Sequence, residues 1–413
     1  MTSIEAALSA WGTYDRDNPY PLFDELSELA AVHKATLADG HDVYLVVRHA
    51  EARAALADAR LSKDIHAALA SGDDVVAEGL PGPSFARHML VVDPPDHTRL
   101  RRLVAGAFSV RRIESLQPRI EAIVDDLLDD IAARGPDTVV DLVSSFAFPL
   151  PFTVICELLG VPNDDRDELA QGLAVLLAPA PTPEQYARAK TASDAVVALL
   201  ERLVAQKKHN PDDALVSALI VARDGDERLN HQELMSTIFQ LIVAGHDTTA
   251  SLIGNSVVAL LRHPEDLDEV RADPAKLPTA IEELMRFDAP VPHATFRYAR
   301  EAIELGGITI PAGAQVLINL AAANRDTRFC PSPQVLDIHR SEVRHLGFGH
   351  GIHFCLGAPL ARMEGQLALS ALIRRFPDLR LAVPVEQLRW GHGDGVVLRG
   401  LSELPVVPGC AVQ

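Results

Sequence analysis

Cysteine, aromatic residues and long apolar runs are all scarce in this sequence, and each shortage excludes a class of protein. Only four cysteines are present, and they are widely scattered, namely Cys156, Cys330, Cys355 and Cys410. A disulfide framework is therefore not expected, and the thiols are predicted to be reduced. The first residues have neither a basic start nor a long apolar run, so no signal or transmembrane segment is predicted. These absences predict a cytoplasmic protein with no membrane partner.

Positive charge is also in short supply. Lys and Arg number 38 against 57 Asp and Glu, which gives a formal net charge of −19. A chain this acidic is not expected to bind nucleic acid or an anionic membrane. Residues 97–112 are a local exception, because they contain no acidic residue. They contain five arginines, namely Arg99, Arg101, Arg102, Arg111 and Arg112.

The chain has enough apolar residues to bury a large core. Hydrophobic residues make up 48% of 413, and no linker, low-complexity tract or repeat divides the sequence. We therefore expect a single domain over residues 1–413, with a helix-rich lobe and a smaller β-rich lobe. The fold class predicted from periodicity is mainly α with small β-sheets.

Helical periodicity is strongest between Asn230 and Pro264. Asn230 can cap a helix, Glu233 stands at the capping-box position, and the segment allows about 32 helical residues. Its middle is apolar on nearly every face, so it is predicted to run through the core. Residues 111–134 and 187–207 are predicted to form amphipathic helices.

Strand patterns are fewer and shorter. Residues 43–47 (VYLVV) are predicted to form a strand, and a hairpin is predicted to turn at Gly306–Gly307. A Pro-Ala-Gly turn and another strand follow the hairpin. Residues 71–96 and 325–346 carry no regular period and are expected to be irregular.

The segment HLGFGHGIHFCLG at residues 345–357 is the most informative part of the chain. Its glycines permit a tight, bulged turn, and apolar residues at helical spacing begin directly after Cys355. A cysteine at a helix N-terminus is expected to be a thiolate, and thiolates bind iron. Two other interpretations remain: a buried structural cysteine, and a zinc site formed with His345, His350 and His353.

This loop resembles the haem-binding loop of the cytochromes P450. The family pattern is matched at six positions, namely Phe348, Gly349, Gly351, His353, Cys355 and Gly357. The resemblance implies the P450 fold, with a long central helix over the haem, and a haem b whose iron is bound by Cys355. It also implies an O2-dependent haem-thiolate monooxygenase of the soluble actinomycete type.

Two further motifs support the resemblance. Ala244 to Thr249 (AGHDTT) lies in the middle of the long helix and resembles the family's oxygen-activating groove. The resemblance makes Thr248 the hydroxyl that assists oxygen activation and Asp247 the gate of a proton relay. A threonine there can also bond the carbonyl of Ala244 and open the helix locally.

Glu283 and Arg286 match the family's Glu-x-x-Arg helix and are expected to form a structural ion pair. The family commonly completes this pair with an Arg further along the chain, but Val335 stands at that position here. The resemblance leaves the third partner open between Arg340 and His339.

The resemblance also assigns the groups that hold the haem propionates. These are His97 and Arg101, four residues apart on one predicted helix, together with Arg297 at the start of a strand and His353. Two buried carboxylates require such cations or strong donors.

Substrate-facing residues are carried over from the family by position and are almost all aliphatic. They are Phe85, Leu90, Val91, Leu173, Leu176, Val243, Ala244, Val291, Ala294, Val396 and Val397. Such a lining favours a bulky apolar molecule such as a macrolide, terpenoid or steroid.

The function implied is hydroxylation or epoxidation of that molecule by a monomer. Electrons come from a ferredoxin and its NAD(P)H-dependent reductase, because the chain has no flavin or iron–sulfur domain of its own. The alternatives are a peroxide-driven haem-thiolate peroxygenase and a non-catalytic haem-binding or zinc-binding protein.

Overall fold

The computed structural model describes residues 2–38, 40–64, 85, 87–178, 182–222, 227–340, 342–391 and 397–412. Within them, helices predominate and the strands are short, which confirms the predicted mainly α class with small sheets. The chain forms two compact units. Unit 1 comprises Met1–Leu61, Gln117–Pro151 and Asp247–Gln413, and unit 2 comprises Ser62–Leu116 and Phe152–His246.

The helices of unit 1 come from all three of its segments. They are α1 (Ser3–Ser9), α2 (Tyr20–Leu29), α3 (His49–Ala57), α7 (Gln117–Ala133), the π-helical turn η3 (Val143–Ala147), α13 (Pro264–Ala272), η4 (Pro274–Lys276), α14 (Leu277–Phe287), α15 (Leu320–Ala323), η5 (Gly351–His353), α16 (Ala358–Arg375) and η6 (Val385–Gln387). Unit 2 contains α5 (Asp96–Ala107), α6 (Val110–Glu114), α9 (Asn163–Leu176), α10 (Pro183–His209) and α11 (Leu215–Val221). Two helices, α8 (Pro149–Leu159) and α12 (His231–Arg262), contribute residues to both units.

The largest sheet has the order β1-β2-β8-β5-β3. Its strands are β1 (Val32–Thr36), β2 (Asp42–Val46), β8 (Gln315–Ile318), β5 (Arg297–Ala299) and β3 (Leu61–Ser62). The predicted strand at 43–47 is β2, which pairs antiparallel with β1 and parallel with β8. Alternate residues of β2 lie in two separate core clusters, so both faces of the sheet are buried here and the strand is apolar from Val43 onward.

The predicted hairpin is confirmed. β6 (Ile303–Leu305) and β7 (Ile308–Ile310) pair antiparallel around Gly306 and Gly307, whose φ angles are 58° and 84°. Positive φ at both turn positions favours glycine. The remaining strands, β4 (Val140–Asp141), β10 (Pro405–Val407) and β9 (Arg380–Leu381), form a second small sheet.

The long helix predicted between Asn230 and Pro264 is confirmed as α12, which contains 32 residues. The capping box is present: the Asn230 side chain accepts from the backbone N–H of Glu233, and the Glu233 carboxylate accepts from the N–H of Asn230, both at 2.9 Å. The predicted helix at 187–207 is confirmed within α10.

The single helix predicted over 111–134 is wrong. The structure has two helices, α6 ending at Glu114 and α7 beginning at Gln117. Pro118 explains the break, because it has no N–H to donate to the carbonyl of Glu114 and its ring would clash with that carbonyl. Proline is accommodated in the first turn of a new helix, which is where it lies in α7.

The irregular stretch predicted at 325–346 is confirmed for the residues that the structure describes. The other irregular stretch, 71–96, can be compared only in part. Residues 87–95 contain no helix or strand, and most of the remainder lies outside the described residues.

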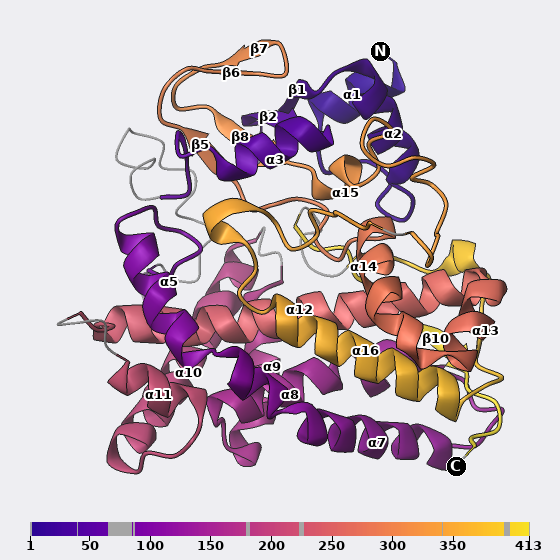
Figure 1. The fold of residues 1–413 in the computed structure, drawn as a ribbon. Coiled ribbons are helices and arrows are strands. Elements are labelled where there is room, and N and C mark those ends of the chain that lie inside the picture. The colour runs from indigo at the N-terminus through magenta and orange to yellow at the C-terminus, as the bar shows by residue number, and fades with distance from the viewer. Residues whose placement is uncertain are drawn as a thin grey trace. The chain divides into compact units, whose positions relative to one another are not determined.

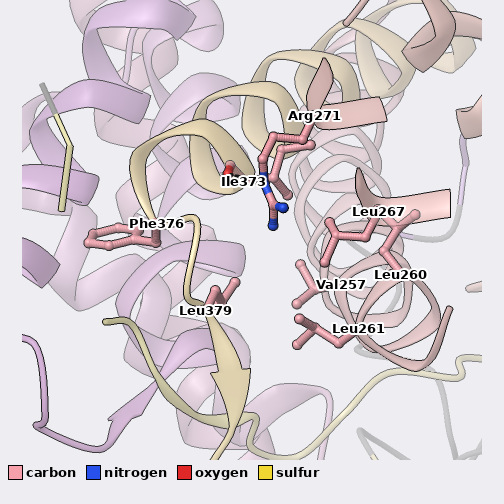
Figure 2. A pocket seen from close by; sticks show the side chains of 8 residues that line it. All are labelled: Val257, Leu260, Leu261, Leu267, Arg271, Ile373, Phe376 and Leu379. Atoms are coloured by element: carbon pink, nitrogen blue, oxygen red, sulfur yellow. Dashed lines mark hydrogen bonds between the residues drawn. The ribbon is translucent and has the colours of Figure 1, made fainter. Parts of the chain in front are cut away.

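Helix α16 is packed against neighbours on several sides within unit 1. It lies along α7, as Figure 1 shows, and also contacts α13 and α14. At Gly365 an added Cβ would lie 3.1 Å from Ile281 and 3.3 Å from Leu252, so glycine permits this close packing. A cavity of only about 10 Å³ remains near the C-terminal end of α16, between apolar side chains and Arg271 (Figure 2). That volume is about the minimum for one water molecule, so this cavity is not a substrate site.

Candidate functional site

The cysteine loop is a compact turn held by its own backbone. The N–H of Cys355 donates to the carbonyl of Phe348 at 2.9 Å, and Gly349 and Gly351 have φ angles of 73° and 74°. Helix α16 begins at Ala358 rather than directly after Cys355, because Gly357 occupies the N-cap position. The cysteine therefore lies just before the helix N-terminus.

Gly351 is required for more than its positive φ. A Cβ at this position would lie 2.9 Å from the carbonyl oxygen of Leu56 and 3.2 Å from the Cα of Ala57. These atoms are backbone at the C-terminal end of α3 and cannot move away at low cost. The cysteine loop thus lies directly against α3, and a larger residue at 351 would separate them.

The surroundings of Cys355 distinguish it from the buried cysteines. Its side chain is exposed, and the neighbouring apolar side chains of Ile352 and Phe354 are 48% and 40% exposed. By contrast, burial raises the pKa of Cys156 to about 12, so that thiol stays protonated. An accessible thiol on an open apolar surface fits a flat apolar cofactor with an iron centre.

The zinc interpretation is not supported. Among the residues that the structure describes, no three His, Cys, Asp or Glu side chains come together as a metal-binding group. The ring of His345 is engaged elsewhere, with Nε2 3.2 Å from a carboxylate oxygen of Glu282 and Nδ1 accepting from the N–H of Gly347.

Two of the four predicted propionate ligands lie in unit 1 with the cysteine. Arg297 begins β5 and is 3% exposed, with one guanidinium nitrogen 3.4 Å from the carbonyl oxygen of Thr295. His353 is half-buried at the end of η5. A buried cation and a histidine in the same unit as the exposed thiol fit the cofactor's carboxylates.

The other two predicted propionate ligands lie in unit 2. His97 is buried and Arg101 is half-buried, and both are on α5, as the four-residue spacing predicts. The neighbouring Arg99 does not belong to an open basic surface. Its guanidinium pairs with Glu233, the residue of the α12 capping box, and it is only 18% exposed.

The two residues predicted to handle protons are consecutive on α12. Asp247 is 5% exposed, whereas Thr248 is half-buried. The helix is continuous through both residues. Ala244, one turn before Thr248, is exposed although its helix is mostly buried. An open patch on a buried helix is the feature that the oxygen-activating groove requires.

A second carboxylic acid, which sequence reasoning missed, lies close to this helix. Glu364 on α16 is 1% exposed and is hydrogen-bonded to the side chain of Thr249. Burial raises the pKa of Glu364 to about 8, so the group is protonated at neutral pH. A glutamate nine residues after the cysteine gave no signal of its own in a single sequence.

The Glu283–Arg286 pair is fully buried and has a third member. The Arg286 guanidinium donates to both carboxylate oxygens of Glu283 at 2.7 Å, and Arg340 donates to Glu283 Oε2 at 3.2 Å. His339 pairs instead with Glu269. Arg340 therefore occupies the role left open by Val335.

Arg286 also organises the irregular segment around it. Its guanidinium donates to the carbonyls of Asn324, Pro333 and Val335 at 2.8 to 3.3 Å. A segment without regular structure needs such donors for its buried carbonyls.

The predicted substrate-facing residues differ in exposure. In unit 1, Val291 and Val397 are half-buried, Ala294 is buried, and Val396 lies outside the described residues. In unit 2, Leu90, Val91, Leu176 and Val243 are half-buried and Ala244 is exposed.

Two predicted lining residues of unit 2 are fully committed to packing. Phe85 stacks on Phe239 with ring centroids 3.9 Å apart, and Leu173 is buried on the helix that lies along α10.

Among the described residues, no helix has the length and hydropathy needed to span a membrane.

Comparison with known proteins agrees with this geometry. The family model described as Cytochrome P450 matches residues 33–383. Cytochrome P450 107B1 from Saccharopolyspora erythraea is 45% identical, covering 96% of this chain and 95% of that protein. Vitamin D(3) 25-hydroxylase from Pseudonocardia autotrophica is 42% identical, covering 98% and 99%.

A solved structure gives the same result for the fold. The tirandamycin C-bound P450 monooxygenase TamI superimposes with a TM-score of 0.85 at 40% identity, covering 95% of this chain and 98% of that one. With the cysteine loop, the buried Glu283–Arg286 pair and these matches in hand, the chain is a member of the cytochrome P450 family and a monooxygenase.

Proposed function

We propose that this protein binds haem b through the thiolate of Cys355 and hydroxylates or epoxidises a bulky apolar small molecule with O2. The observation that carries the proposal is the accessible thiol between the exposed side chains of Ile352 and Phe354. His97, Arg101, Arg297 and His353 would hold the propionates. When bound, the haem supplies the redox chemistry that inserts one atom of O2 into the substrate.

The chain's own residues supply proton delivery and water exclusion. Thr248 offers a hydroxyl on the open patch of α12, and Asp247 directly before it offers a carboxylate that can take up and release protons. We place the whole activity in one domain and one monomer.

The substrate class rests on the aliphatic lining and on the relatives. One relative is named a vitamin D(3) 25-hydroxylase, and one related structure holds tirandamycin C. Both support a carbon-rich substrate. A screen of macrolides, terpenoids and steroids for changes in the haem spectrum would find it.

The test of the haem assignment is the spectrum of the reduced carbon monoxide complex. Purified wild-type protein should give the red-shifted band of a thiolate-bound haem, and Cys355→Ala should lose it. Cys410→Ala is the matched control, because Cys410 is also exposed. A band that survives in Cys355→Ala would overturn the assignment.

The electron donor proposed is an acidic ferredoxin reduced by an NAD(P)H-dependent reductase. Arg102 and Arg111 are exposed on α5 and α6, and their positive charge makes them the centre of the proposed docking surface. Arg99 is only 18% exposed, and Arg112 is half-buried. Complementary charge speeds encounter and is screened by salt.

Charge reversal tests this docking surface. Arg102→Glu and Arg111→Glu should slow reduction by ferredoxin, and the difference from wild type should shrink at high salt. Arg188→Glu on α10 is the control, since it makes the same charge change at another exposed arginine. Equal slowing by all three variants would place the docking surface elsewhere. Product formation with hydrogen peroxide alone, at the full rate, would favour the peroxygenase.

A further inference from the structure

Arg362 lies at the start of the second turn of α16, the helix that follows the cysteine loop. Its guanidinium forms a two-pronged ion pair with Glu282 of α14, with nitrogen–oxygen distances of 2.6 and 2.8 Å. A fork of this kind fixes the plane of the guanidinium as well as its position.

The fixed guanidinium stacks on the ring of Phe348. The central carbon of Arg362 is 4.5 Å from the ring centroid, which is a cation–π contact. Phe348 is 9% exposed and is packed with Leu252, Met285 and Ala358. Its carbonyl is the acceptor of the Cys355 N–H. One residue is thus stacked on by Arg362 and hydrogen-bonded to the cysteine.

His345 holds the ion pair from the other side. Its Nδ1 accepts the N–H of Gly347 at 2.9 Å, so in the neutral ring the proton is on Nε2, which donates to Glu282 at 3.2 Å. A Cβ at Gly347 would lie 2.8 Å from the terminal methyl of Met285 and 2.9 Å from the His345 ring, so a side chain there would force both to move.

Both members of the pair stay charged. Burial alone would raise the pKa of Glu282, but the hydrogen bonds from Arg362 and His345 outweigh it and lower that pKa to about 2. The hydrogen bond to Glu282 is the main cause that raises the pKa of Arg362, and electrostatic attraction to Cys355 adds to it. The positive member of the pair lies over Phe348, the residue whose carbonyl accepts from the Cys355 N–H, and this contact connects it to the cysteine.

We propose that Arg362 is a positioning residue that sets the reduction potential of the iron bound to Cys355, with Glu282 moderating its charge. This rests on the proposed function, because it requires Cys355 as the iron ligand. The one-electron reduction from ferric to ferrous iron adds a negative charge to the site. A nearby cation favours that reduced state and a nearby anion disfavours it.

Replacing each member of the ion pair should therefore shift the reduction potential in opposite directions. Arg362→Gln removes the cation, so the potential should become more negative. Glu282→Gln removes the anion and leaves the cation uncompensated, so the potential should become more positive. Both variants break the same ion pair, and a purely structural role would shift both potentials in the same direction. Arg362→Lys keeps the positive charge but not the two-pronged ion pair, so its reduction potential should lie between those of wild type and Arg362→Gln.

The measurement is a spectroelectrochemical titration of each purified holoenzyme, with the electron taken from the mediator system. Arg271→Gln is the matched control. It also removes a half-buried arginine that binds the backbone of α16, but at Ile373, about 16 Å further along the helix. Its potential should equal that of wild type.

Opposite shifts for Arg362→Gln and Glu282→Gln, with no shift for the control, support the proposal. Shifts of the same sign, or none, overturn it. If Glu282→Gln cannot be purified with haem, the order of the reduction potentials of wild type, Arg362→Lys and Arg362→Gln decides instead. Failure of the proposed function looks different, because the wild-type protein would then lack the red-shifted carbon monoxide band.

Discussion

Thr248 is the residue whose chemical role can be tested most directly. It is half-buried beside the buried Asp247, and the proposed function makes its hydroxyl the donor of protons that O–O cleavage consumes. Thr248→Ala should lower product formation by roughly 10²-fold while electron consumption continues.

The measurement compares NAD(P)H consumed with product and peroxide formed. Thr248→Ser retains the hydroxyl and should restore most of the coupling. Asp247→Asn should slow turnover and leave the ratio of product to NAD(P)H closer to wild type. A fully coupled Thr248→Ala enzyme would remove Thr248 from proton delivery.

The Glu283 cluster offers a second test at the residue scale. Arg286→Lys keeps one charge but cannot bind both carboxylate oxygens and three carbonyls together, so the free energy of unfolding should fall by about 3 to 5 kcal/mol. Arg340→Gln should cost less, about 1 to 3 kcal/mol, because Glu283 keeps Arg286.

Chemical denaturation of the variants provides these values. His339→Gln is the control and should change stability by less than about 0.5 kcal/mol, since His339 pairs with the surface residue Glu269. A larger cost for His339→Gln than for Arg340→Gln would mean that the third partner has been misidentified.

These clusters also show how much of the site could be predicted from the sequence. The motif of Glu283 and Arg286 pointed to an ion pair, but nothing in the sequence chose between Arg340 and His339 as its third member. That choice depends on the path of the irregular segment 325–346, whose sequence has neither helical nor strand periodicity. Glu364 and Arg362 were missed for a similar reason, because their partners on α12 and α14 are distant in sequence.

At the scale of elements, Glu364 links α16 to α12 in its protonated form. Its pKa is about 8 in the folded protein, against an ordinary value of 4.5, because it is fully buried. The folded state therefore binds one proton more than the unfolded state between these values. The resulting stability is complete below pH 4.5 and is lost as the pH rises through 8.

Glu364→Gln should remove this dependence. The wild-type protein should lose on the order of 4 kcal/mol relative to Glu364→Gln between pH 5 and pH 9. Thermal unfolding of both proteins across that range measures the difference. Glu403→Gln, at an exposed glutamate, should follow the wild-type curve. Parallel curves for wild type and Glu364→Gln would show that Glu364 is already ionised.

Element boundaries were predictable where local chemistry is strong. Asn230 and Glu233 fixed the start of α12, and the two glycines fixed the β6–β7 turn. The break between α6 and α7 was missed because the apolar period continues across Pro118, although the proline itself was the available signal. The start of α16 was placed too early because Gly357 is a cap rather than a helical residue.

At the scale of the whole chain, Arg399 ties distant segments of unit 1 together. Its guanidinium binds Asp288 at 2.6 Å and the backbone carbonyls of Arg16 and Asp17, and it lies 4.8 Å from the Trp390 ring. Arg399→Gln should release the N-terminal segment and raise local opening there by at least about tenfold.

Hydrogen exchange of the peptide covering residues 12–20 measures that opening. Arg389→Gln is the control, because Arg389 also pairs with Asp17 but is 61% exposed. Its exchange rates should stay close to those of wild type. Unchanged exchange in Arg399→Gln would mean that the aromatic contacts alone hold the segment.

The contact between Gly351 and the end of α3 has a consequence for the time course of synthesis. The backbone that the cysteine loop contacts, at Leu56 and Ala57, belongs to an early part of the chain. β2 is also early, and it pairs with β8, whose residues follow about 270 positions later. On a ribosome the early segment emerges long before either partner exists. The cysteine loop can therefore reach its final form only after β8 and the loop itself have been synthesised, long after α3 has left the ribosome.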